Sequence, residues 1–593
     1  MNRIFKYLFV LGFVGFASGI VLFTYRPFLG IDDAYIYFVY AKNLVNGHGF
    51  VYNVGSERVE GFTSMLWVLI CSASYKIFSE AYFRQALMLL NILMVSFALF
   101  RLVDFIDRRF YGSNKILPSF PSLCLLCVLF VVKGFLDWTV LSLLETGLWS
   151  SCLIITTVHL LELCYTPASK SEPLIFGLLL AVLVLTRPES LLLAVIFLTI
   201  RFLLLLQKRQ HFFVAFRASV FPSVLFVVTF AALVLFRLNY FGYPFPNTYY
   251  AKVSSDSMGN IKEGITYFFK FFYVYPFYWL CLIMLLASLW VLIRTAFRGL
   301  RQFATFSNEN LAQTVLVLIT CVALLLPMMV GGDHFSLFRI YQPFVPVFLM
   351  LLLNKYFIQK NLFDWQILKM PGNHIPRSVW LIVLLPVIYL MNIPKYFVGE
   401  HVPYKASLLS DFSFPYTYRQ VSVKLNNFFD FSPKPSIGRI WAGAYAFGYD
   451  GATVDLMGLN STIMAHASNI KVGLKNHASF DKSAFYKLQP DFVEGHFLDA
   501  AEQLNFQLQD NQPDFEKRFE YAVLKGIHHD SAFIHLYQPV LISRSGTNGI
   551  FFTYARKDYI LFLRAKGYKV EIFERKPIIQ HVTLTKHKAL KTA

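Results

Sequence analysis

Long apolar segments recur through the first two thirds of the chain, and this repetition constrains the fold more than any other feature. A helix needs about 20 mainly apolar residues to cross a bilayer. With 56% hydrophobic and only 15% charged residues, the 593-residue chain is too apolar for a soluble protein. The sequence therefore predicts a polytopic α-helical membrane protein with about 11–13 transmembrane segments. Twelve candidates lie near residues 5–25, 62–78, 85–103, 116–132, 147–164, 172–186, 189–205, 213–236, 271–293, 312–330, 343–357 and 377–394.

The N-terminal segment resembles a signal peptide in having Arg3 and Lys6 before an apolar run. No small-residue cleavage site followed by a soluble domain is evident, so we predict an uncleaved first span. All seven cysteines precede residue 330, which predicts a tail without disulfides.

The formal charge of +19 reflects basic residues in short loops, at 108–115, 207–209, 294–301 and 355–369. The positive-inside rule places these loops in the cytoplasm, with everything after about residue 395 on the opposite side. Twelve crossings would bring the tail back to the cytoplasmic side. One candidate is therefore not a full crossing or one is missed, and we expect the error within residues 62–150.

The composition changes after the apolar region. We predict a transmembrane domain at residues 1–395 and a C-terminal extracytoplasmic α/β domain at 396–593. Alternating polar and aromatic residues predict short strands near 437–445, 452–456, 490–493, 532–537 and 549–555, with a helix at 497–508.

The first external loop, residues 26–61, carries adjacent carboxylates at Asp32 and Asp33. The segment that follows, 33–45, predicts an amphipathic helix in the membrane interface, with its tyrosines at headgroup depth. One hypothesis is that these acids only cap the helix. The other is that one of them is a general base. Further candidates for substrate contact in this loop are Tyr35, Lys42, His48 and Glu60.

Two polar motifs interrupt the apolar segments farther along the chain. The sequence Leu144-Glu145-Thr146-Gly147 places Glu145 at a membrane edge. There it either orients an acceptor or pairs with a cation, or it is an ordinary helix-end charge. The sequence Thr186-Arg187-Pro188-Glu189 lies between two apolar runs. A buried arginine needs a partner there. Either Glu189 pairs with Arg187, or Arg187 binds a phosphate.

Two more motifs lie on the predicted external side. The turn Pro246-Asn247 leads to Lys252, which could line a cleft with neighbouring tyrosines. The hinge Gly331-Gly332 presents Asp333 and His334, followed by Arg339. We favour sugar or phosphate contact over metal ligation for this pair, because adjacent residues rarely both ligate. No Walker A, GxGxxG or HExxH motif is present in the sequence.

These motifs together resemble those of the GT-C membrane glycosyltransferases, collinearly over about residues 1–470. The most similar branch is that of the terminal β-(1→2) arabinofuranosyltransferases of mycobacterial cell-wall arabinan. The most specific motif is the first loop, from Asp32-Asp33-Ala34-Tyr35 through Gly47-His48-Gly49 to Glu60-Gly61. The sequence departs from the family pattern at two places. Leu143 replaces the usual small residue before Leu-Glu-Thr-Gly, and Thr63-Ser64 replaces the commoner Thr/Ser-Asn.

The resemblance implies a multi-pass enzyme of a bacterial inner membrane. It would transfer a sugar from a polyprenyl-phosphate donor to an envelope glycan, lipid or protein, with inversion. Asp32 would be the first choice of base and Asp33 the second. Arg187, Lys252 and Arg339 would hold the donor phosphate. Tyr35, Lys42, His48, Glu60, Glu145, Asn247, Asp333 and His334 would contact substrates, and a divalent cation is possible.

Two other classes of protein stay open on the sequence. A transporter or flippase for lipid-linked sugars should show internal repeats and charges at the membrane midplane. No repeat is evident, and the charges lie mostly at segment ends. A non-catalytic envelope assembly protein should tolerate loss of both aspartates.

Overall fold

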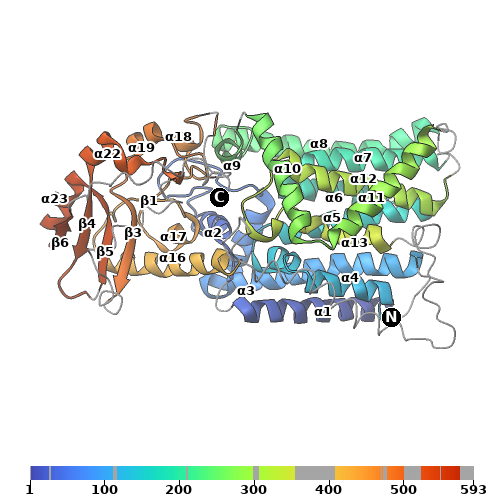
Figure 1. Ribbon diagram of the computed structural model, residues 1–593, viewed down its shortest axis with the longest axis horizontal. Coiled ribbons are helices and arrows are strands. Elements are labelled where there is room, and N and C mark those ends of the chain that lie inside the picture. The colour runs from blue at the N-terminus through green and yellow to red at the C-terminus, as the bar shows by residue number, and fades with distance from the viewer. Residues whose placement is uncertain are drawn as a thin grey trace.

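The computed structural model describes residues 2–25, 29–110, 116–208, 211–254, 256–297, 306–353, 408–468, 470–471, 477–499, 522–547 and 549–573. A bundle of long helices occupies one end of the molecule and a sheet domain the other (Figure 1). The predicted boundary between residues 395 and 396 and the predicted segment 377–394 lie outside the described residues.

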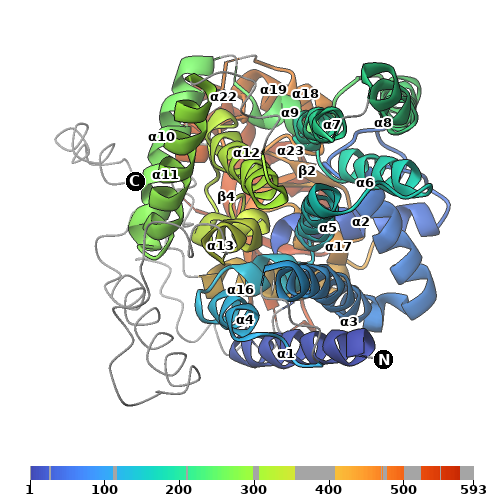
Figure 2. The ribbon, with the colours of Figure 1, turned by 90° about the vertical axis from the view of Figure 1, so that its right-hand side faces the viewer.

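Eight helical segments among the described residues are long and apolar enough to cross a membrane. The prediction of a polytopic α-helical membrane protein is therefore confirmed. Seven of these segments are α1 (Asn2–Tyr25), α3 (Met65–Phe105), α5 (Thr146–Tyr165), α7 (Ser190–Gln207), α8 (Phe212–Phe241), α11 (Tyr278–Phe297) and α12 (Asn308–Met329). The eighth runs from Ser336 to Leu353 and includes α13 (Val345–Leu353), while α4 (Phe120–Val131) and α6 (Glu172–Thr186) are shorter. Seen along the bundle, α5 lies among the other helices (Figure 2). This position agrees with its burial, since 83% of the apolar window of α5 is buried inside the protein.

The predicted spans 62–78 and 85–103 are wrong as separate crossings, because both belong to α3. The helix breaks at Ser79, whose φ is 58°. Residues on both sides of the break pack at one end of the bundle: the Trp67 indole donates to the Leu143 carbonyl at 3.0 Å, and Phe83 packs on Phe38. The first part of α3 thus stays at this end, and only the second part runs the length of the bundle. Removing one crossing makes the predicted total odd, as the loop charges require.

The far end of the bundle is fixed by buried charges. Lys6 on α1 lies 2.9 Å from Asp107, and Arg3 lies 3.0 Å from Asp104 near the end of α3. The start of α1 therefore meets the end of α3, so these two helices run antiparallel.

The C-terminal region contains a six-stranded mixed sheet in the order β2-β1-β3-β5-β4-β6. Strands β1 (Ile437–Arg439), β2 (Thr453–Asp455) and β3 (Phe492–Asp499) pair in parallel, while β4 (Tyr537–Ser543), β5 (Gly549–Arg556) and β6 (Lys569–Ile572) pair antiparallel. Helices α16 (Leu408–Phe428), α17 (Gly443–Gly448), α18 (Thr462–Ala465), α19 (Lys482–Leu488), α22 (Ser531–Leu536) and α23 (Lys557–Ala565) accompany it. The predicted α/β domain is confirmed.

Two predicted strands in this domain are partly wrong. The predicted strand 532–537 is mostly helix α22, which begins at an Asp530 cap, and the predicted strand 437–445 ends after β1 and runs into α17. Of the predicted helix at 497–508, residues 497–499 belong to β3 and pair with β5, and the others lie outside the described residues. Pairing with a distant strand outweighs local propensity at 497–499.

The bundle and the sheet domain meet at a seam. Helices α2 (Asp32–Val45), α9 (Asn247–Lys252), α16 and α17 gather there (Figure 1). Side chains of α2 and α17 pack directly on one another, as in the contact of Phe38 with Phe447. The seam therefore brings the first external loop next to the sheet domain.

Candidate functional site

Helix α2 begins where the sequence predicts. Ile31 is extended, and Asp32 and Asp33 occupy the first helical turn, where negative charge is favourable. The prediction that the tyrosines of α2 face lipid headgroups is wrong, since Tyr35, Tyr37 and Tyr40 are all buried within the protein. They are covered because α3 and α17 pack on this helix from two sides.

Asp32 points toward the sheet domain. Its two carboxylate oxygens accept hydrogen bonds from the backbone amides of Gly443 at 3.0 Å and Ala444 at 2.8 Å. Burial raises the pKa of Asp32 to about 6, against the opposing effect of these two amides. Asp32 thus joins α2 to the start of α17.

Asp33 points toward a group of cations instead. Its Oδ2 lies 3.3 Å from Arg339 Nη1 and 4.0 Å from Lys252 Nζ. Its side chain keeps 26% exposure, and that of Lys252 keeps 27%. Burial alone would raise the pKa of Asp33, but the charges of Lys252 and Arg339 outweigh it and lower the pKa.

The Gly-Gly hinge supplies the other side of this group. Asp333 Oδ2 accepts from Arg339 Nε at 2.7 Å, and Asp333 Oδ1 lies 3.3 Å from His334 Nδ1. Gly332 has a φ of +71°, and a Cβ there would lie 2.6 Å from the Tyr267 side chain. Only glycine meets both conditions, so the hinge fixes where Asp333 lies. Its pKa is held well below the ordinary value, because Arg339 outweighs the effect of burial.

A second charged cluster surrounds Arg187. Its guanidinium lies 2.7 Å from Glu145 and 3.1 Å from Glu189, and it stacks over Trp149 at 4.9 Å. The pairing with Glu189, one of the two alternatives raised by the sequence, is therefore present. Tyr37, one turn after Asp33 on α2, donates to Glu145 at 3.0 Å. The two clusters thus share helix α2.

One carboxylate beside the site is not marked by any sequence motif. Asp411, on α16 of the C-terminal domain, accepts from the Ser336 hydroxyl at 2.8 Å. Burial raises its pKa to about 6, and the charges of His334 and Arg339 oppose that rise. No local motif marks Asp411, because only the packing of α16 brings it here.

The remaining predicted site residues lie elsewhere on the seam. Glu60 forms a buried bidentate pair with Arg237, at 2.8 and 2.9 Å. The Lys42 amine donates to the Phe447 carbonyl at 3.4 Å, and the Tyr35 hydroxyl accepts from Arg84 at 2.7 Å. His48 is exposed on a turn.

Asn247 is likewise held within the seam. Its amide donates to the carbonyls of Gly458, Leu459 and Ser461, at 2.8, 2.9 and 3.3 Å. These contacts fix the start of α9 on the turn between β2 and α18. Lys252, at the other end of α9, faces Asp33.

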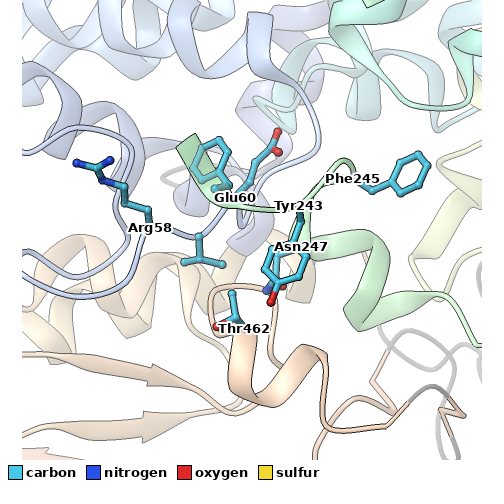
Figure 3. Close-up of a pocket in the computed structure, with 8 residues that line it drawn as sticks. Arg58, Glu60, Tyr243, Phe245, Asn247 and Thr462 are labelled. Atoms are coloured by element: carbon cyan, nitrogen blue, oxygen red, sulfur yellow. The ribbon is translucent and has the colours of Figure 1, made fainter. Parts of the chain in front are cut away.

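A small hollow opens beside this attachment (Figure 3). Glu60 and Asn247 line it, together with Arg58, Tyr243, Phe245 and Thr462. The hollow lies at the Asn247 end of α9, whereas the Asp33 group lies at the Lys252 end. The paired charges of Asp33, Lys252 and Arg339 gather at the latter end.

Within the described residues, no group of three or more His, Cys, Asp or Glu side chains is placed to hold a metal ion. Asp33 and Asp333 are instead balanced by Lys252 and Arg339. No metal-dependent step follows from this donor set.

A scan against protein-family models finds no match for the sequence, and a search of curated proteins finds none either. Among solved structures, the chain is similar to the archaeal oligosaccharyltransferase AglB from Archaeoglobus fulgidus in complex with an inhibitory peptide and a dolichol-phosphate. The identity is 13% over 93% of this chain and 74% of that chain, with a TM-score of 0.47. It is also similar to ArnT from Cupriavidus metallidurans bound to undecaprenyl phosphate, with 14% identity over 92% of this chain and 98% of that chain and a TM-score of 0.45. At this level of similarity the two structures do not indicate which residues act in this chain.

Proposed function

We propose that this protein is an inverting GT-C glycosyltransferase that moves a sugar from a polyprenyl-phosphate donor to an acceptor of the cell envelope. One observation carries the proposal. Asp33, Lys252, Asp333 and Arg339 come from three motifs as much as 306 residues apart, yet they form one charged group at the end of the bundle. A group that combines a partly exposed carboxylate with two cations suits base-assisted displacement of a phosphate.

We assign the base to Asp33 rather than Asp32, because both Asp32 oxygens are engaged by α17. The acceptor hydroxyl gives its proton to the Asp33 carboxylate as its oxygen attacks the anomeric carbon. The bond from that carbon to the phosphate oxygen breaks, and the electron pair leaves with the polyprenyl phosphate. Lys252 and Arg339 stabilise the charge that develops there. One displacement inverts the configuration.

Donor binding also prepares Asp33 for this role. In the free protein its pKa is lowered by Lys252 and Arg339, which makes it a weak base. A bound phosphate competes for the same two cations. Asp33 then loses part of their stabilisation, its pKa rises, and it becomes a better proton acceptor when a donor is present.

The membrane setting fits a lipid-linked donor, which reaches its site sideways from the bilayer. We propose that the protein lies in a bacterial inner membrane with the Asp33 group and the sheet domain outside the cytoplasm. Arabinofuranose is the first donor sugar to test, because the motif resemblance is greatest to that branch. The proposed acceptors are an envelope glycan, glycolipid or protein.

Purified protein in nanodiscs with a synthetic polyprenyl-phosphate sugar and an acceptor panel tests the reaction class. The proposal predicts equal amounts of glycosylated acceptor and free polyprenyl phosphate. A transporter would instead move the intact donor across a proteoliposome membrane without consuming it. Donor movement without product, over a panel of pentose and hexose donors, would overturn the proposal.

A further inference from the structure

The C-terminal domain carries a row of aromatic rings that leads into the charged group. On α16, Phe414 and Tyr418 lie one turn apart with ring centroids 6.1 Å apart and planes at 14°. On its other side, Phe414 lies 6.3 Å from Trp441 with planes at 17°. The three rings are therefore nearly parallel, and neighbouring centroids are about one sugar ring apart.

Exposure separates this row from the core of the same domain. Core aromatic pairs are buried, whether edge to face as in Phe428–Phe429 at 81° or stacked as in Phe533–Tyr537 at 15°. In the row, Phe414 is 47% exposed, and the other two rings are only partly buried. A group of exposed aromatic side chains is typical of a binding surface.

The row continues to the site without a break. Trp441 lies 5.8 Å from the ring of His477, and His477 lies 4.3 Å from the ring of His334. His334 in turn contacts Asp333. Hydroxyl-binding groups thus lie at one end of the row and apolar faces along it.

We propose that Tyr418, Phe414 and Trp441 form a platform that binds the acceptor glycan, whose terminal sugar then lies beside His334. This inference rests on the proposed function and names the acceptor as a chain of several sugars rather than a monosaccharide. Sugars carry apolar C–H faces that pack on flat aromatic rings, while their hydroxyls bind groups such as His334 and the Asp411 carboxylate. The continuity of the row with the catalytic group favours a glycan over a lipid or a protein partner.

Binding without donor tests the platform separately from transfer. In the Asp33→Asn protein, which should not turn over, the affinity for a disaccharide, a tetrasaccharide and a hexasaccharide of arabinofuranose and of glucose is measured by calorimetry. We expect the affinity to rise with the number of sugars for either the arabinofuranose or the glucose oligosaccharides. Trp441→Ala and Phe414→Ala should each weaken it at least tenfold, and Trp441→Phe should largely retain it. Phe562→Ala, a similarly exposed ring on α23, is the matched control.

Three results would overturn the platform: no oligosaccharide binds, the two alanine variants bind as the parent does, or Phe562→Ala weakens binding equally. Fluorescence quenching by brominated lipid that is weaker in Trp441→Phe than in the parent would assign the row to the membrane instead and would also overturn the platform. Transfer with an unchanged acceptor KM in both alanine variants refutes the platform and leaves the transferase intact. Trp441-dependent glycan binding in a protein that transfers no sugar refutes the transferase and leaves the platform.

Discussion

Replacing Asn247 with alanine should loosen the seam and displace Lys252, which we propose binds the donor phosphate. The Asn247 amide is buried and donates to carbonyls of the sheet domain at 2.8, 2.9 and 3.3 Å. The two short bonds contribute about 1 kcal/mol each. Asn247→Ala should therefore weaken the attachment of α9 to the sheet domain by about 2 kcal/mol of free energy. This loss raises the population of the open seam roughly 30-fold.

Hydrogen exchange of peptides covering residues 247–252 and 456–465 measures this opening directly. Exchange in both peptides should accelerate roughly 30-fold in the variant. Transfer should fall as well, because Lys252 at the other end of α9 no longer holds its place beside Asp33. Asn46→Ala, at the exposed end of α2, is the control and should change neither the hydrogen exchange of these peptides nor the rate of transfer. Unchanged exchange in Asn247→Ala would refute the role given to these hydrogen bonds.

Three further predictions concern buried charge, pH and packing. Glu60→Gln should destabilise the protein by about 3–5 kcal/mol, because it leaves a buried arginine without its partner; a second change, Arg237→Met, should restore part of the loss in chemical denaturation. The acid limb of kcat/KM that belongs to Asp33 should lie below the ordinary range of an aspartate, since Lys252 and Arg339 lower the pKa of Asp33 in the free protein and the carboxylate is lost only as pH falls through that pKa. The acid limb of kcat should lie at higher pH, and coincident limbs would contradict release of Asp33 by the donor. Gly264→Ala should lower thermal stability, because its Cβ would lie 1.9 Å from a backbone oxygen of α12, whereas Gly15→Ala, with open space around it, should not.

Helical geometry explains why the sequence could not decide between Asp32 and Asp33. Successive residues on a helix point about 100° apart, so two adjacent acids cannot face the same partner. Which one faces the cations depends on where α17 and Arg339 lie, and both are distant in sequence. The helix 33–45 itself follows from local pattern and was predictable within one residue.

The other predictions divide in the same way, between features that depend on local pattern and features that depend on distant contacts. The apolar segments and the α/β character of the tail depend on composition and periodicity, which the sequence shows directly. The path of the chain at Ser79 does not, because the six residues 79–84 between the two apolar runs are typical of either a break or a turn. Glu60 and Asn247 carry the residue types of a binding site, but their partners are distant in sequence. Arg237 lies on α8 of the bundle, and the turn at 458–461 belongs to the sheet domain.

The assignment of the base to Asp33 is tested by comparing two neighbouring variants. Asp33→Asn and Asp32→Asn are assayed for transfer from a polyprenyl-phosphate sugar under single-turnover conditions with a saturating acceptor. Asp33→Asn should lower the rate by a factor of about 100 or more, while Asp32→Asn should retain much of the rate and accelerate hydrogen exchange at residues 443–448. Loss of transfer in Asp32→Asn alone, with Asp33→Asn active, would contradict the assignment of the base.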